Sequence, residues 1–397
     1  MKSQKKSLTP RERREITKNV IVFVVTLILS IAYVIVGHRI ATGSISQYDD
    51  EDLEVLQGNI TQITDRVPYE SGENVGMKVK INRGDHKGET VYAILQISEH
   101  NLSNLSDAKA GDEVILYTNV DDNVNADWIV AGYERFTSIM WLGIIFIFLI
   151  LVFGRIKGVN TIVSLGFTCL AVFYVMVPAI VNGQNIYAWA IVTCIYIIIM
   201  TMLFVNGVTK KSFVAGAGCT AGVVVAGIIT LIMNAVMHMS GFSNEESTLI
   251  YYLNDEPLDL IALIFAAIVV GAVGAIMDVA MDIASSLNEL ASTVPDITHS
   301  QLIKSGFNIG RDIMGTMANT LVLAYIGSSL SCVILLYAYS SSLLDLFNME
   351  MIATELLQAL AGSIGIMLSI PLTTFISAYT YIHAKNKDET ETNELTK

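Results

Sequence analysis

Eight long runs of apolar residues, separated by short polar segments, dominate this sequence. They cover roughly residues 20–37, 138–153, 161–181, 186–205, 213–237, 258–280, 313–337 and 357–381. A helix that crosses a bilayer needs about 20 consecutive apolar residues, so each run predicts a membrane-spanning helix. The first run follows a basic segment, is long for a signal peptide and lacks a small-residue cleavage site, so we expect an uncleaved anchor.

The basic residues between the runs predict which side of the membrane each connection faces. Cytoplasmic connections carry an excess of Lys and Arg. If the N-terminus is cytoplasmic, all of the following lie inside: Arg155, Lys157, Lys210, Lys211, Lys304, Arg311, Lys385 and Lys387. The short outer connections near 182–185, 238–257 and 338–356 contain no Lys or Arg. This pattern favours eight spans with both termini in the cytoplasm.

The long segment between the first two runs, residues 42–136, has a different pattern. It holds five short stretches rich in β-branched residues, at 56–63, 77–81, 91–97, 114–117 and 128–131. Such stretches separated by turn residues are typical of β-strands. We therefore predict a small extracytoplasmic barrel, OB-like in type. The division is then 1–41 (basic N-terminus and first span), 42–136 (β domain), 137–381 (seven-span domain) and 382–397 (an acidic tail expected to be disordered).

Composition agrees with a membrane protein and excludes other classes. Of the 397 residues, 53% are hydrophobic, and the mean hydropathy is +0.55. That is too apolar for an ordinary soluble domain. The net charge of -13 argues against a nucleic-acid partner, which would need a basic face. The four cysteines lie in apolar runs without zinc-site spacing, and no cofactor is predicted.

Acidic and polar residues follow one face of the sixth span and one face of the seventh. Asp278 and Asp282 are one turn apart, and Asp312 is followed on its own face by Asn319, with Thr320 beside it. Such groups in a membrane segment are costly and are usually paired or functional. Counting from residue 258 places Asp278 near the inner boundary. These five residues predict a polar site between spans six and seven, open to the cytoplasm.

Three other interpretations of these residues stay open. The acids can simply end helices at the interface, with Asp278 paired to Arg311 or Lys304. Met277 and Met281 beside them make a soft metal site a weak alternative. Paired membrane aspartates also suggest a protease, but the Gly-x-Gly-Asp motif of intramembrane aspartyl proteases is absent, so we do not expect an enzyme.

Two further patterns predict how helices pack. Gly218 and Gly222 form a small-xxx-small face in the fifth run, which favours close helix contact. Between residues 292 and 310, apolar residues such as Leu302 and Phe307 predict a short amphipathic helix on the inner leaflet.

The two polar segments carry a resemblance to a known family. The strings are Gly274-Ala-Ile-Met-Asp-Val-Ala-Met-Asp-Ile-Ala-Ser-Ser-Leu287 and Ser305-Gly-Phe-Asn-Ile-Gly-Arg-Asp-Ile-Met-Gly-Thr-Met-Ala-Asn-Thr-Leu-Val-Leu-Ala-Tyr-Ile-Gly327. With the arrangement of anchor, outer β domain and seven further spans, the chain resembles the YibE/F-like family of bacterial multispan membrane proteins. The resemblance implies this fold and a bacterial inner-membrane location. It implies no substrate or mechanism.

The sequence thus favours a permease, or a permease subunit, for an ion or small solute. Its partners would be the lipid bilayer, the transported solute, and a second copy of the chain or another membrane subunit. The competing hypothesis is a non-transporting membrane scaffold or envelope sensor that acts through the outer β domain.

Overall fold

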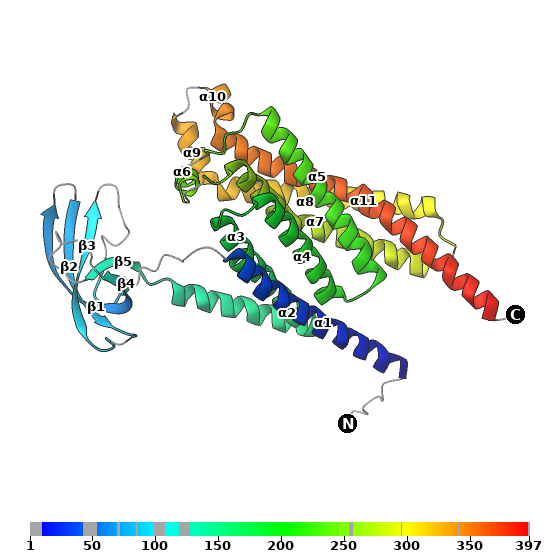
Figure 1. Ribbon diagram of the computed structural model, residues 1–397, viewed down its shortest axis with the longest axis horizontal. Coiled ribbons are helices and arrows are strands. Elements are labelled where there is room, and N and C mark those ends of the chain that lie inside the picture. The colour runs from blue at the N-terminus through cyan, green and yellow to red at the C-terminus, as the bar shows by residue number, and fades with distance from the viewer. Residues whose placement is uncertain are drawn as a thin grey trace. The chain divides into compact units, whose positions relative to one another are not determined.

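The computed structural model describes residues 10–42, 54–69, 72–84, 86–98, 108–118, 128–243, 245–253, 257–294, 296–339 and 342–395 (Figure 1). The chain divides into two compact units. One unit comprises 1–45 and 153–397, and the other comprises 46–152. The basic residues before Pro10 lie outside the described residues.

The smaller unit contains a closed five-stranded barrel. Its strands are β1 (Val55–Tyr69), β2 (Gly72–Ile81), β3 (Thr90–Ser98), β4 (Glu113–Thr118) and β5 (Trp128–Tyr133). They pair in the order β1-β2-β3-β5-β4, and β4 returns to β1, so no edge strand remains. Only β3 and β5 pair in parallel. The predicted small barrel is confirmed, because alternate residues such as Ile60, Met77, Val79 and Leu116 fill its interior.

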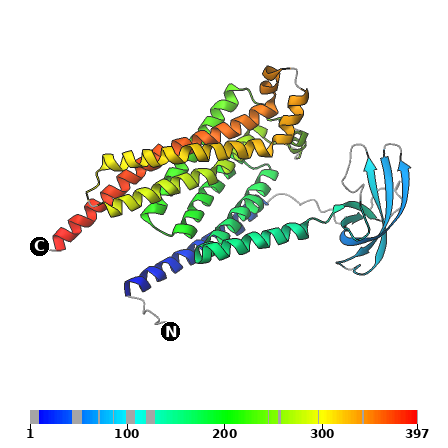
Figure 2. The ribbon, with the colours of Figure 1, turned by 180° about the vertical axis from the view of Figure 1, so that it is seen from behind.

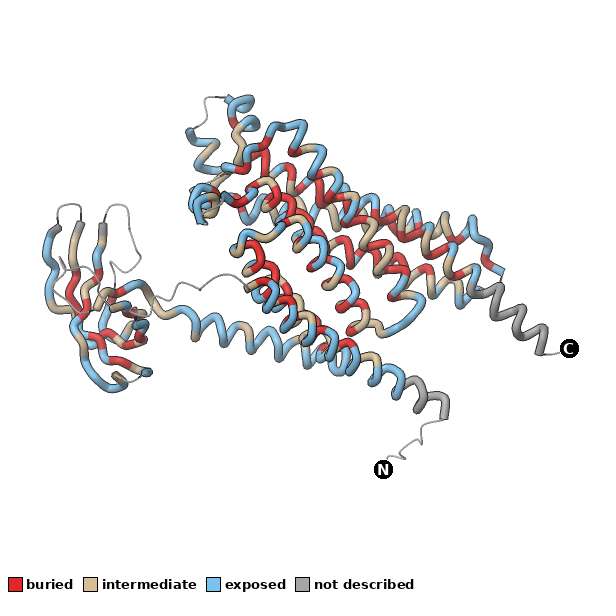
Figure 3. The backbone as a smooth tube through the Cα atoms, viewed as in Figure 1, coloured by how far each residue is buried: buried red, intermediate tan, exposed pale blue. Residues whose placement is uncertain are grey.

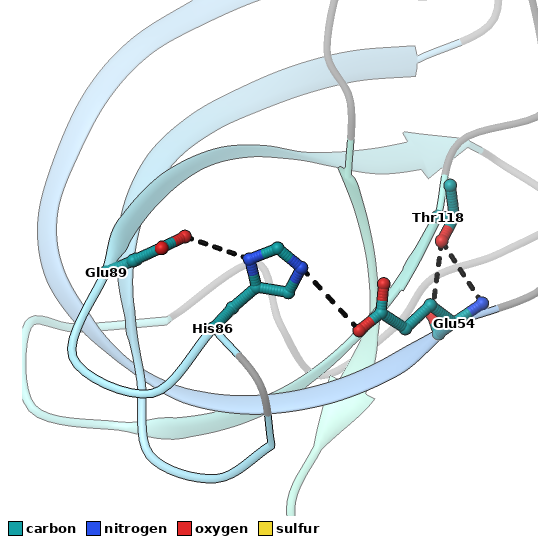
Figure 4. A network of polar contacts seen from close by, with 4 residues as sticks. All are labelled: Glu54, His86, Glu89 and Thr118. Carbon is teal, nitrogen blue, oxygen red and sulfur yellow. Dashed lines mark hydrogen bonds and ion pairs between the residues drawn. The ribbon is translucent and has the colours of Figure 1, made fainter.

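A polar network ties one end of the barrel together (Figure 4). The Nδ1 atom of His86, in the turn between β2 and β3, lies 2.9 Å from a carboxylate oxygen of Glu89. Its Nε2 atom lies 3.8 Å from the carboxylate of Glu54, just before β1. The backbone N–H of Glu54 donates to the hydroxyl of Thr118 at the end of β4. The turn is thereby fixed to the seam where β1 and β4 close the barrel.

The larger unit is helical. Helix α2 (Phe136–Leu170) begins in the smaller unit and ends in the larger one. The other elements of the larger unit are α1 (Pro10–Ala41), the π-helical turn η2 (Ala171–Met176), α3 (Val177–Val181), α4 (Ile186–Asn206), α5 (Lys210–Val236), α6 (Glu245–Tyr251), α7 (Leu260–Thr293), α8 (His299–Ser328), α9 (Leu330–Tyr339), α10 (Leu343–Asn348) and α11 (Glu350–Leu395).

Several of these helices are long and apolar enough to cross a membrane. Among the described residues, six pass by length and composition, and a seventh does if α8 and α9, bent by 65°, count as one span. This confirms the predicted class of a mostly helical protein with several apolar helices. One of the six, Phe136–Val181, is 46 residues long. It is interrupted at Arg155, whose φ of 50° and ψ of -126° are not helical.

Helix α11 is the packing centre of the bundle, with α5, α7 and α8 against it. Glycines allow the close approach. A Cβ atom at Gly218 of α5 would lie 2.8 Å from the Cβ of Thr373, and one at Gly306 of α8 would lie 2.5 Å from a methyl carbon of Thr374. Figure 2 shows the same helices from behind, and Figure 3 shows buried positions in red along them.

Two helix ends differ from the sequence-based expectation. The segment expected to lie on the inner leaflet is instead the first half of α8, which begins at His299 behind a capping box of Thr298 and Gln301. The acidic tail, expected to be disordered, continues α11 as a helix to Leu395. Extending an existing helix needs no new nucleation, so a polar segment can follow it.

Candidate functional site

Helix α7 is the most buried of the apolar helices, yet one stripe along it is open. In its most apolar stretch 61% of the residues are buried, the highest share among the described spans. Between residues 260 and 290 its exposed positions follow one another at intervals of three, four or seven residues, which places them on one face. They are Ala267, Gly271, Gly274, Asp278, Asp282 and Glu289. The stripe is therefore lined by small residues at one end and by carboxylates at the other.

Asp278 lies about half-way along this helix. Helix α7 extends to Thr293, so Asp278 stands just past the midpoint of its 34 residues. The neighbouring Ile276 packs at the middle of the bundle, since one of its methyl carbons lies 2.8 Å from where a Cβ of Gly222 would be. The inner-boundary position expected from the sequence was counted from residue 258, and it stays a prediction. The structure continues α7 for more than three turns past residue 280.

Polar groups mark the two ends of the open stripe. At one end the ammonium group of Lys211, in the first turn of α5, donates to the hydroxyl of Ser285 over 3.1 Å. Seven residues separate Ser285 from Asp278, or about 10 Å of helix. At the other end the hydroxyl of Tyr325 from α8 covers Gly271, 2.7 Å from the position a Cβ would take. Between these two contacts lie Gly274, Asp278 and Asp282.

The polar residues of α8 lie on the opposite face of that helix from its packing contacts. Gly306 and Gly310 pack against Thr374 and Ile370 of α11. Asn319 follows Gly310 by nine residues, two and a half turns, and therefore points the other way. Asp312, Asn319 and Thr320 are all exposed. The hydroxyl of Thr320 donates within its own helix, to the carbonyl of Thr316 over 2.8 Å.

The five sequence-predicted site residues thus form two separate sets. Asp278 and Asp282 share the open stripe of α7, whereas Asp312, Asn319 and Thr320 belong to the outer side of α8. In the described part of the chain no ion pair joins Asp278 to Arg311 or Lys304.

The nearby methionines belong to the apolar core. Met277 is buried and Met281 partly buried, and both pack in the main hydrophobic cluster. Within the described ranges, no group of three or more His, Cys, Asp or Glu side chains is placed to hold a metal ion.

A cavity opens beyond the Gly271 end of the stripe. It has a volume of about 250 Å³ between α6, α7 and α11. Its lining includes the side chains of Glu246, Glu355 and Gln358, together with hydroxyl groups of serine and threonine residues. Ala267 belongs both to this lining and to the stripe. Sequence reasoning missed this cavity and the residue Tyr325, because both depend on tertiary contacts between helices that the pattern along the chain does not specify. The signal that could have indicated them was the placement of Gly271 and Gly274 above the aspartates.

Long apolar helices around a polar stripe, with a separate small barrel near the N-terminus, define a multi-pass helical membrane protein. The chain belongs to the YibE/F-like protein family, whose match covers residues 142–383, from α2 to the end of the apolar part of α11. No curated protein and no solved structure is significantly similar to the chain.

Proposed function

We propose that this protein is a membrane permease, or the permease subunit of a larger carrier, for a small cation. One observation carries the proposal: the most buried apolar helix, α7, exposes Asp278 close to its midpoint and Asp282 one turn further on. A charge at that depth costs about 2.5–3.5 kcal/mol on insertion scales, so a carboxylate there marks a pathway more often than a helix end.

The chemistry of the open stripe favours a cation over an anion. Two carboxylates one turn apart attract positive charge, and carboxylate and hydroxyl oxygens suit hard cations or a relayed proton. The cationic side chain of Lys211 donates to Ser285 near the inner end of the stripe, and the carboxylates of Asp278 and Asp282 lie further along it. A path would run from the cavity at Ala267, past Tyr325 and Gly271, to Asp278 and Asp282.

The energy for transport would not come from nucleotide hydrolysis by this chain. The sequence contains no Gly-x-x-x-x-Gly-Lys-Ser/Thr string. An ion gradient or a separate subunit would then drive transport.

Eight membrane crossings accord best with the helices described. A helix of 46 residues would be about 69 Å long, more than twice the thickness of the hydrocarbon layer. The break at Arg155 divides it into two passes. Together with the bent α8–α9 pair, this division gives eight crossings. In this arrangement both termini lie in the cytoplasm, the barrel is extracytoplasmic, and the membrane is a bacterial cell membrane. Labelling of single cysteines at positions 157 and 183 from each side tests this arrangement; labelling of both from the same side contradicts it.

Transport in proteoliposomes tests the proposed path. Asp278→Asn and Asp282→Asn keep side-chain size and remove charge, so each should reduce uptake of labelled monovalent and divalent cations at least about tenfold. Glu289→Gln is the matched control, an exposed acid on the same face nearer the helix end. If the Asp278→Asn/Asp282→Asn double variant transports like wild type, the path is wrong.

The scaffold or sensor hypothesis is favoured by one observation on the barrel. A polar cavity of about 210 Å³ there is lined by Asn82, Arg83, Glu113 and Glu134, among others. Removal of residues 42–136 separates the two hypotheses. Retained transport supports the permease, whereas loss of the cellular phenotype in a protein that never transports supports the scaffold.

A further inference from the structure

Helix α8 carries charged and polar side chains half-way along the bundle, on a face that nothing in the described chain covers. Arg311 and Asp312 lie near the midpoint of its 30 residues, and both are exposed. Their neighbour Gly310 packs on Ile370, near the middle of the apolar part of α11. These side chains therefore lie at the depth where lipid chains would surround a single copy.

Four exposed residues and one partly exposed residue form a seam with a seven-residue repeat. The seam consists of Asp312, Gly315, Asn319, the partly exposed Val322, and Ile326, which follow one another at intervals of three and four residues. This spacing is the one at which two membrane helices pack with a left-handed crossing. A Cβ atom at Gly315 would meet nothing within 4 Å, so the seam is open to a close neighbour at its centre. Ile326 at its end is 47% exposed, an apolar continuation of the same seam.

Lipid cannot satisfy this face, because acyl chains offer no hydrogen bonds or counter-charges. A neighbouring helix can. Interhelical hydrogen bonds of Asn and close contact at Gly are among the forces that hold membrane helices together.

We propose that this face of α8 binds the same face of a second copy of the chain, forming a two-fold symmetric dimer. The charges indicate a second copy because they are self-complementary. In a two-fold interface each copy presents the same patch, so Arg311 of one copy meets Asp312 of the other, and the reciprocal pair forms as well. Asn319, two turns further on, then faces its own counterpart and can both donate and accept. The proposal goes beyond transport and does not depend on it.

A charge-exchange cycle tests the pairing. The full-length protein is reconstituted in liposomes at decreasing density, and dimers are counted by single-molecule photobleaching. Arg311→Asp places four acids at the seam and should weaken dimerisation at least about tenfold. The double variant Arg311→Asp/Asp312→Arg restores opposite charges and should recover most of the dimer. If the double variant is as monomeric as the single variant, the proposed pairing is wrong.

A second variant guards against misfolding caused by charge reversal. Asn319→Leu suits lipid better than the native residue, so it should insert normally and still raise the monomer fraction. Thr320→Val is the matched control, one residue away, off the seam and with its hydroxyl bonded inside its own helix. The proposal is overturned if the wild-type protein is monomeric at every density, or if Asn319→Leu and Thr320→Val change the monomer fraction equally. It is also overturned if this face captures only a different membrane protein. Asp278→Asn should leave the dimer unchanged while it reduces cation uptake, so the two proposals fail separately.

Discussion

At the scale of single residues, the contact between Tyr325 and Gly271 is the most restrictive feature of the α7 stripe. It joins α8 to α7 at the point where the acidic stripe meets the cavity. A methyl group at Gly271 would lie 2.7 Å from the Tyr325 hydroxyl, nearer than side-chain atoms normally approach. Gly271→Ala should therefore lower the free energy of unfolding by about 1–3 kcal/mol, measured by thermal unfolding in nanodiscs.

A neighbouring glycine and a rescue variant make this prediction specific. Gly274→Ala lies one turn away on the same open face, where a Cβ meets nothing within 4 Å. It should be neutral or stabilising by about 0.5–1 kcal/mol, since Ala favours helix over Gly. In Tyr325→Phe the nearest ring atom is 3.9 Å away, so this change should rescue Gly271→Ala. Equal melting temperatures of the two alanine variants would contradict the contact.

At the scale of helices, the start of α11 holds the turn that follows α5. Glu350 accepts hydrogen bonds from the backbone N–H of Ser240 over 2.8 Å and of Gly241 over 2.5 Å, and from the Ser240 hydroxyl over 2.7 Å. Gly241 has a φ of 89°, so the turn itself is shaped by glycine. The carboxylate thus joins two elements that are distant in sequence, at the wall of the cavity.

Glu350→Ala should lower the free energy of unfolding by about 1–3 kcal/mol, because charge-assisted hydrogen bonds are lost and backbone donors are left without them. Hydrogen exchange of the amides of Ser240 and Gly241 should also accelerate. Glu355→Ala, one acid further along α11, leaves those three bonds in place and serves as control. Unchanged exchange at residues 240 and 241 would show that the turn holds without Glu350.

Sequence reasoning located most helices but misplaced α8, and the reason is physical. Hydropathy finds segments that are apolar all round, such as α4 and α5, within a few residues of their ends. The first half of α8 carries Lys304, Asn308 and Arg311, so its average is polar. It nevertheless packs against α11 through Gly306 and Gly310, and Leu302, one turn before them, is buried as well. That narrow small-residue stripe was readable in the sequence. Its partner on α11, 60 residues further on, was not.

The candidate site was predictable to a similar extent. The spacing of Asp278 and Asp282 on one face of α7 follows from helix geometry alone. The sequence did not indicate that α7 continues to Thr293, because residues 281–293 are too polar for hydropathy to include. The direction of Asn319 depended on which face of α8 meets α11, a tertiary contact that periodicity does not specify. Hydropathy therefore predicted most of the helices. Which polar faces lie together could be seen only from how the helices pack against one another.

At the scale of the whole molecule, the two units hold separate cores. The barrel closes through the pairing of β1 with β4 and buries its own apolar residues, and the helical unit packs around α11. A closed barrel has no unpaired edge to cover and needs no neighbour to complete it. This independence agrees with a family match that begins at residue 142, after the last strand.

A fragment of residues 46–135 should therefore fold alone in water. We expect a β-type circular dichroism spectrum and one cooperative unfolding transition in urea, since a single small core unfolds as a unit. Leu116→Asp would bury an unpaired carboxylate in the centre of the core, where Leu116 is fully buried, and should abolish folding. Tyr117→Asp, the next residue on the same strand, is 41% exposed and points outward, so it should fold. If the wild-type fragment is unfolded, the barrel depends on the membrane helices and the two-unit description fails. If both variants unfold, the alternation of inward and outward side chains along β4 is wrong.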